Sequence, residues 1–197
     1  MDAGRAPVNI VFWGEERRSR TSAHMLAVAG MLSAMHRSAE VMPGVQKKRR
    51  RAEFYLYDMG AGLDSRKRHI LWRADLVVVN LRQEEAQVKR FFLEHAHIAR
   101  NVLLLLGGYQ EEARVNCRYL ERMYRVEPDR TAGIPHSNAF CRALVMQKSG
   151  EFIQREYKNP TSFQNEVFIR ALWESTALLL KVAETGQVGG EVKQIKK

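Results

Sequence analysis

Four short apolar runs divide the first half of the chain, and none of them alternates apolar with polar residues. They lie at 8–13, 54–60, 74–80 and 102–106, and each stops at or directly before a glycine, aspartate or asparagine. Short runs without alternation are typical of strands that are buried on both faces, as in a parallel sheet. The pattern therefore predicts four buried strands at these positions.

Helical periodicity separates these strands and continues after the last one. The predicted helices cover 21–34, 65–72, 84–99, 115–124, 140–147 and 163–183. Residues 36–52 show no clear pattern, and the segment from 125 to Pro135 is interpreted as a loop. Strands that alternate with helices indicate a sheet covered by helices on both faces. The predicted fold class is α/β, a three-layer sandwich with a mainly parallel sheet.

Composition fits a single globular domain, which we expect to span 1–185, followed by a flexible basic tail at 186–197. Of the 197 residues, 45% are hydrophobic and 27% are charged, which are ordinary globular values. The apolar runs are too short for a membrane span, and the first residues lack a signal-peptide pattern. Two cysteines, Cys117 and Cys141, cannot form a disulfide framework and are not spaced for a metal site. We therefore expect a cytoplasmic protein.

Ligands of parallel sheets bind in the loops that follow the carboxyl ends of the strands. The first such loop lies between a strand and a helix and reads Gly14-Glu15-Glu16-Arg17-Arg18-Ser19-Arg20-Thr21-Ser22. A P-loop, G-x-x-x-x-G-K-[ST], uses glycines to turn backbone N–H groups toward phosphate, a lysine to reach the terminal phosphates and a hydroxyl to hold Mg²⁺. Gly14 and Thr21 fit this pattern. Ser19 stands at the second glycine, and Arg20 stands at the lysine.

This stretch resembles the opening of the ParA/MinD-type ATPases, which are P-loop proteins of the SIMIBI class, including their TadZ-like and mobile-element-associated members. Their usual pattern after the first strand is K-G-G-x-G-K-[ST]-[ST]. In that register Glu15 takes the position of the signature lysine, and only Thr21 and Ser22 are unchanged. The three glycines are replaced by Glu16, Arg17 and Ser19.

Later segments resemble the same family in the same order. Residues 57–63, YDMGAGL, look like its Walker B turn, and 74–79, ADLVVV, are similar to its following strand. Residues 133–143, which begin with Gly-Ile-Pro, resemble a late segment that lies near the adenine in the family. The resemblance covers roughly residues 8–150. One departure is the family's second strand with its acidic switch segment, which we expect to be missing or shrunken before residue 54.

The resemblance implies a nucleotide site, whose residues would be Gly14, Ser19, Arg20, Thr21, Ser22 and Pro135, with Mg²⁺ held by Thr21 and Asp58. The substitutions in this loop disfavour nucleotide binding. Residues other than glycine disfavour positive φ, and Glu15 and Glu16 place negative charge beside a triphosphate. We therefore expect no catalysis and no cofactor, with ATP and Mg²⁺ bound only if the loop still functions. Asp58 has an alternative role as a cap on the turn at Gly60.

The net charge of +10 points to an anionic partner, without identifying it. A block of five positive charges, Lys47, Lys48, Arg49, Arg50 and Arg51, is the candidate nucleic-acid contact. Its alternative interpretation is a solvated loop. Further arginines at 17, 18, 20, 66, 68 and 73 favour a real anion-binding surface, although no recognition helix or zinc finger accompanies them.

Three functions remain open at this point. The first is a non-catalytic, ParA/MinD-like positioning or scaffolding protein in DNA partitioning, conjugation, or pilus or secretion localisation. It would work with a protein partner or as a homodimer, in which Glu15 and Glu16 could pair with arginines of the second copy. The second is a divergent ATPase in which Arg20 replaces the lysine. The third is a nonspecific nucleic-acid-binding domain that uses the basic block.

Overall fold

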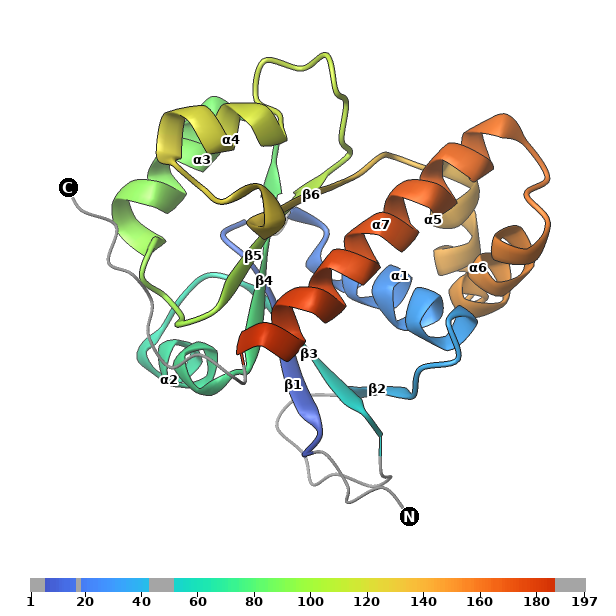
Figure 1. The fold of residues 1–197 in the computed structure, drawn as a ribbon, viewed down its shortest axis with the longest axis horizontal. Helices are drawn as coiled ribbons and strands as arrows, with labels where there is room; N and C mark the ends of the chain where they lie inside the picture. Colours follow the sequence, from blue (N-terminus) through green and yellow to red (C-terminus); the bar gives the residue numbers. More distant parts are fainter. Residues whose placement is uncertain (1–5, 17–18, 43–51, 187–197) are drawn as a thin grey trace.

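The computed structural model describes residues 6–16, 19–42 and 52–186, which form a parallel sheet between two layers of helices (Figure 1). The strands are β1 (Val8–Gly14), β2 (Ala39–Met42), β3 (Phe54–Ala61), β4 (Leu76–Arg82), β5 (Val102–Gly107) and β6 (Thr131–Ile134). Their order across the sheet is β2-β3-β1-β4-β5-β6, and every neighbouring pair is parallel. The predicted α/β three-layer sandwich is therefore confirmed.

Alternate residues of the central strand β1 serve the two faces of the sheet. Ile10 and Phe12 pack with the helices on one face, whereas Val11 and Trp13 pack with those on the other. All four side chains are at most 2% exposed. Both faces of β1 are thus core, which explains why its sequence is continuously apolar.

One helical layer consists of α1 (Thr21–Ala34), α5 (Asn138–Val145), α6 (Ser149–Lys158) and the long α7 (Phe163–Gly186). The other contains α2 (Ser65–Arg73), α3 (Glu85–Arg90), the π-helical turn η2 (Phe91–His95) and α4 (Cys117–Tyr124). A short 3₁₀ turn, η3 (Pro128–Arg130), leads into β6. Figure 1 shows the two layers on either side of the sheet, with α7 crossing the strands.

Four parts of the structure depart from the predicted pattern. Strand β2 lies in the segment without a clear pattern, so the second strand is present but only four residues long. Strand β6 lies in the predicted loop and is equally short. Helix α6 was not predicted, because most of its residues are polar and few of its side chains are buried. The predicted helix 84–99 is shorter than expected and changes to a π-turn at Phe91.

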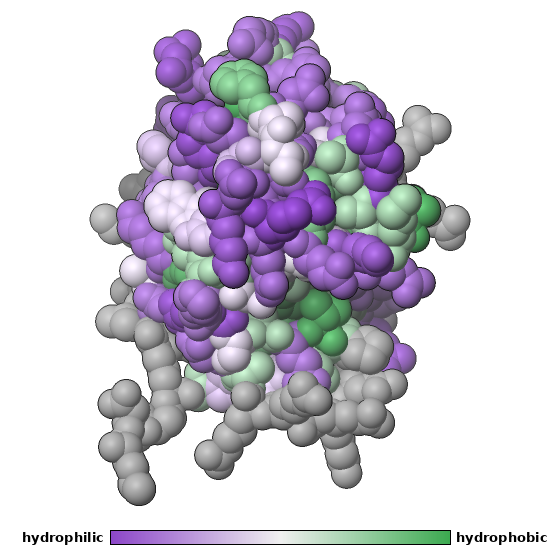
Figure 2. Space-filling view, turned by 90° about the vertical axis from the view of Figure 1, so that its right-hand side faces the viewer, coloured by the Kyte–Doolittle hydropathy of each residue, from purple (hydrophilic) through white to green (hydrophobic). Residues whose placement is uncertain are grey.

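Figure 2 views the side of the molecule that lies on the right of Figure 1, where α5, α6 and α7 are found. This surface is mostly hydrophilic, with several separate hydrophobic areas. Val145 and Met146, at the end of α5, are among the exposed hydrophobic residues of the chain. Among the described helices, none is long and apolar enough to cross a membrane.

Candidate phosphate-loop site

The loop after β1 lies at the carboxyl edge of the sheet, between the ends of β3 and β4. Gly14 pairs with Ala61 of β3 and with Asn80 of β4, and helix α1 begins seven positions later at Thr21. This is the strand–loop–helix arrangement that the sequence predicted. The residue before α1 is Arg20, whose φ of 54° and ψ of 36° are left-handed. A side chain in that conformation costs about 1 kcal/mol relative to glycine.

The loop is folded tightly over the end of β1. A Cβ atom placed on Gly14 would lie 2.7 Å from Oγ1 of Thr21 and 2.8 Å from Cβ of Ser19, so only glycine fits there. Ser19 and Thr21 are both buried. The backbone N–H of Ser19 donates to the carbonyl oxygen of Glu16 at 3.0 Å, and its hydroxyl accepts from Nε2 of Gln87 at 3.2 Å. The Ser19 amide is therefore used within the loop.

Both glutamates of the loop are held by one arginine of the same chain. Nε of Arg90, at the end of α3, donates to Glu15, and a terminal nitrogen of its guanidinium donates to Glu16. The Glu15 side chain is only 8% exposed, and its second carboxylate oxygen is buried without a hydrogen-bond partner among the described residues. These hydrogen bonds raise the pKa of Arg90 further above its ordinary value. This intramolecular clamp was missed by sequence reasoning, and the pairing of Glu15 and Glu16 with arginines of a second copy stays a prediction.

Arg20 reaches away from the loop toward the segment that follows β6. Its guanidinium lies 2.9 Å from Nδ1 of His136, and Nε2 of His136 lies 2.9 Å from Oδ1 of Asn138. Since an arginine can only donate, His136 accepts at Nδ1 and donates from Nε2. Arg20 and Pro135, two of the predicted nucleotide-binding residues, line the same pocket of about 260 Å³.

Asp58 faces Ser22 in this structure. Its Oδ2 accepts from the Ser22 hydroxyl, and its Oδ1 accepts from the backbone N–H of Gly60 at 2.8 Å. The second contact is the turn cap that was the alternative role for Asp58. Thr21, the other residue predicted to hold Mg²⁺, packs its hydroxyl against Gly14. Both oxygens of Asp58 are thus engaged by protein donors.

His24 forms a buried contact that the sequence did not reveal. It lies one turn into α1, and its Nδ1 is 2.8 Å from Oδ1 of Asn80 at the end of β4. A Cβ atom on Gly107 would come within 2.3 Å of the His24 ring, so the end of β5 closes against it. Burial lowers the pKa of His24 from 6.5 to about 4. The bond to Asn80 opposes this shift, and the charge of Arg20 adds to it. His24 is therefore a neutral residue in the floor of the pocket.

Several polar groups of the described loop are engaged within the protein itself. The Ser19 amide bonds within the loop, the carboxylates of Glu15 and Glu16 lie beside it, and each oxygen of Asp58 accepts one hydrogen bond from the protein. Among the described residues, no group of three or more His, Cys, Asp or Glu side chains could hold a metal ion. The basic block Lys47, Lys48, Arg49, Arg50 and Arg51 and the tail after Gly186 lie outside the described residues.

No family model and no curated protein matches the sequence. Solved structures do match the fold. The cell division ATPase MinD of Pyrococcus furiosus aligns over 87% of this chain and 99% of its own, with a TM-score of 0.61 and 13% identity. A ParA family ATPase of Chlorobium tepidum TLS aligns over 87% and 98%, with a TM-score of 0.57 and 10% identity. A plasmid partition protein of Borrelia burgdorferi B31, bound to AMPPNP, aligns over 90% and 99%, with a TM-score of 0.58 and 11% identity. The chain therefore has a ParA/MinD-like fold.

Proposed function

We propose that this protein is a non-catalytic, ParA/MinD-like positioning or scaffolding protein. It keeps the fold of ATPases that serve cell division and plasmid partition, without their phosphate chemistry. Its place would be the cytoplasm, and its role would be to localise DNA or a conjugation, pilus or secretion apparatus through a protein partner or a second copy. Of these assignments, the loss of phosphate chemistry is the one that the loop geometry supports most directly.

The observation that carries it is the clamp of Arg90 on Glu15 and Glu16. Phosphoryl transfer depends almost entirely on positioning the terminal phosphate, the metal ion and the attacking water. A phosphate in this loop would meet two carboxylates whose compensating cation is already bound to them. Opening the clamp would leave the buried carboxylate of Glu15 unpaired, which is strongly unfavourable.

Arg20 is the second part of the argument. In a working P-loop the corresponding side chain reaches the phosphates. Here the guanidinium is bound to His136 in the segment after β6. The residue that would have to replace the lysine is thus bound to the segment after β6 at the pocket.

The decisive experiment is a calorimetric titration of the purified protein with ATP and ADP, with and without Mg²⁺. We expect no binding at millimolar nucleotide. A matched variant should restore the family's residues in the loop: Glu15→Lys, Ser19→Gly and Arg20→Lys together. Gain of Mg²⁺-dependent binding in that variant alone would identify the substitutions as the cause of the loss.

Micromolar, Mg²⁺-dependent binding by the wild-type protein would overturn the proposal. It would favour the divergent ATPase, in which Arg20, Thr21 and Asp58 form a working site. In that case Thr21→Ala should abolish the Mg²⁺ dependence, while the neighbouring Ala23→Ser should leave it intact. Binding of nucleotide without any effect of Mg²⁺ would equally contradict an inactive site.

A further inference from the structure

The end of helix α5 exposes apolar side chains beside a hollow. Val145 is 85% exposed and Met146 is 67% exposed. Together with Asn138, Cys141 and Arg142 they line an open hollow of about 410 Å³. A single exposed apolar residue is ordinary, but neighbouring ones beside a hollow indicate a surface that contacts another molecule.

This hollow continues into the pocket of about 260 Å³ between α1 and α5. Cys141 and Val145 line both of them. The walls of the pocket include the apolar side chains of Ile134, Leu144 and Phe168. An apolar depression thus runs from the exposed end of α5 down to the first turns of α1.

The pocket contains a hydrogen-bond acceptor that no described residue uses. His24 lines the pocket and is 7% exposed. Its Nδ1 donates to Oδ1 of Asn80, because the amide nitrogen of Asn80 already donates to two carbonyl oxygens at 3.3 Å. The other ring nitrogen, Nε2, is therefore an acceptor, and it makes no hydrogen bond with any described residue. A buried acceptor without a partner is unfavourable, and a donor inside the pocket would satisfy it.

The charges at the rim of this depression are positive. Arg20 and Arg142 are its only charged lining residues in the described part of the chain. Arg20 is bound to His136, whereas exposed Arg142 makes no hydrogen bond or ion pair with a described residue. The same holds for exposed Lys148, two positions after Met146. A partner with carboxylates would complement this rim, while a second copy would bring the same cations together.

We propose that this depression binds an acidic segment of a protein partner, which inserts one tryptophan side chain into the pocket. An indole ring is large and apolar, and its N–H can only donate, so it matches the apolar walls and the free Nε2 of His24. Tryptophan is also a frequent anchor residue of protein interfaces. Acidic residues beside it would meet Arg142 and Lys148. The inference rests on the proposed function in one respect, because a nucleotide bound at Arg20 and Pro135 would compete for the same pocket.

The test uses the full chain and a short synthetic peptide that carries one tryptophan between glutamates in an alanine background. Calorimetry measures its affinity, and NMR of the isotope-labelled protein should place the shifted signals at Ala23, Leu144 and Val145. A second peptide has benzothienylalanine, in which sulfur replaces the indole N–H, so it keeps the ring size but cannot donate. It should bind about three- to tenfold more weakly, because His24 then stays without a partner. A third peptide, with glutamine for glutamate, should bind more weakly and lose the dependence on salt.

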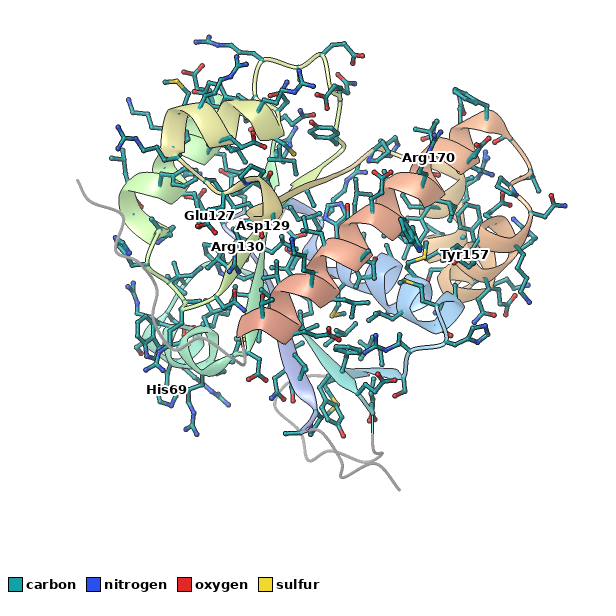
Figure 3. All side chains as sticks on the ribbon, viewed as in Figure 1. His69, Glu127, Asp129, Arg130, Tyr157 and Arg170 are labelled. Carbon is teal, nitrogen blue, oxygen red and sulfur yellow. The ribbon has the colours of Figure 1, made fainter. Side chains whose placement is uncertain are left out.

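Variants of the protein test the surface itself. Val145→Glu places a carboxylate at the mouth of the pocket and should lower the affinity at least about tenfold. Its control is Met123→Glu, the same change of charge at a residue of α4 that is 63% exposed. Arg142→Gln should weaken binding about two- to fivefold. Arg170→Gln is its control, because Arg170 lies on α7 in the same helical layer (Figure 3) and is already paired with Glu166 at 3.9 Å.

Four outcomes would overturn the proposal. They are the absence of shifted signals at the pocket with millimolar peptide, an equal loss in Val145→Glu and Met123→Glu, equal binding of the benzothienylalanine peptide, and a wild-type dimer that Val145→Glu converts to a monomer. The last result would assign the surface to a second copy. Thermal unfolding at the wild-type temperature should confirm that the variants fold.

The same samples separate this inference from the proposed function. ATP that binds the wild type and displaces the peptide would contradict the proposed function, while the peptide site itself would stand. A protein that binds neither ATP nor the peptide would contradict the peptide site alone.

Discussion

The imidazole Nδ1 of His24 lies 2.8 Å from Oδ1 of Asn80, and the two buried side chains join α1 to the end of β4. The Nδ2 atom of Asn80 donates to the carbonyl oxygens of Trp13 and Val78, both at 3.3 Å. This fixes Oδ1 of Asn80 as the acceptor toward His24. His24 is thus neutral and carries its proton on Nδ1.

This relationship predicts a loss of stability in mild acid. Folded His24 has a pKa lowered to about 4, whereas an unfolded histidine titrates near 6.5. Between these values the unfolded state binds more protons, so the free energy of unfolding decreases as the pH falls from 6.5 to 4. The expected contribution is about 3 kcal/mol. Chemical denaturation over this pH range should show a flatter profile for His24→Gln than for the wild type, and parallel profiles would contradict the assignment.

The Arg90 clamp makes a second prediction. Arg90→Ala removes the only described partner of a largely buried carboxylate, so the urea midpoint of unfolding should fall. Arg114→Ala is the control, because its pairing with Glu85 at 3.1 Å is between exposed side chains, and such pairs contribute little. If the two variants unfold at the same urea concentration, the clamp does not stabilise the loop.

Charge reversal of Glu15 and Glu16 tests whether their partner lies in the same chain or in a second copy. Since Glu15 and Glu16 are bound by Arg90 of their own chain, Glu15→Lys together with Glu16→Lys should lower the unfolding midpoint without changing the oligomeric state. Light scattering of both proteins at matched concentration measures that state. If the wild type is a dimer and the variant a monomer, Glu15 and Glu16 contact a second copy, and the prediction is wrong.

The sequence predicted the sheet well where strands are buried on both faces. β1, β3, β4 and β5 were all found from continuous apolar residues. β2 and β6 were not, because each has four residues and lies at an edge of the sheet, where burial and hydrophobicity are weaker signals. The hydrophobic pattern also gives no warning of a π-turn such as η2.

The site was predicted less completely for a different reason. The strand–loop–helix position of Gly14 and Thr21 follows from local pattern, and the structure has it. The partners of this loop are distant in sequence. Arg90 comes 75 positions after Glu15, and His136 comes 116 positions after Arg20. No spacing rule connects such residues, so their pairing could be found only once the chain was folded.

Glu156, in α6, gives a further prediction about stability. It is fully buried at the end of α6 and accepts from the backbone N–H of Thr161 at 2.7 Å, from the Thr161 hydroxyl and from Nδ2 of Asn165 at 3.1 Å. Burial acts to raise the pKa of Glu156, but these hydrogen bonds and the one from Arg155 together lower it. Glu156→Ala should lower the free energy of unfolding by about 1–3 kcal/mol, because it removes an acceptor of the buried Asn165 amide and the hydrogen bonds from Thr161. The control, exposed Glu151→Ala, should stay within about 0.5 kcal/mol in the same denaturation experiment.

The last prediction concerns the contact between Gly107 and His24. A methyl group on Gly107 would overlap the His24 ring, with 2.3 Å between the new Cβ and Cε1, so Gly107→Ala must displace the imidazole from Asn80 or shift β5. Overpacking of this kind costs about 1–3 kcal/mol, which thermal or urea unfolding can measure. Gly150→Ala is the matched control, because its Cβ would meet no atom within 4 Å and alanine favours the helix α6 that contains it. That control should be neutral or slightly stabilising. If Gly107→Ala is equally harmless, the floor of the pocket is not packed as the His24–Asn80 contact requires.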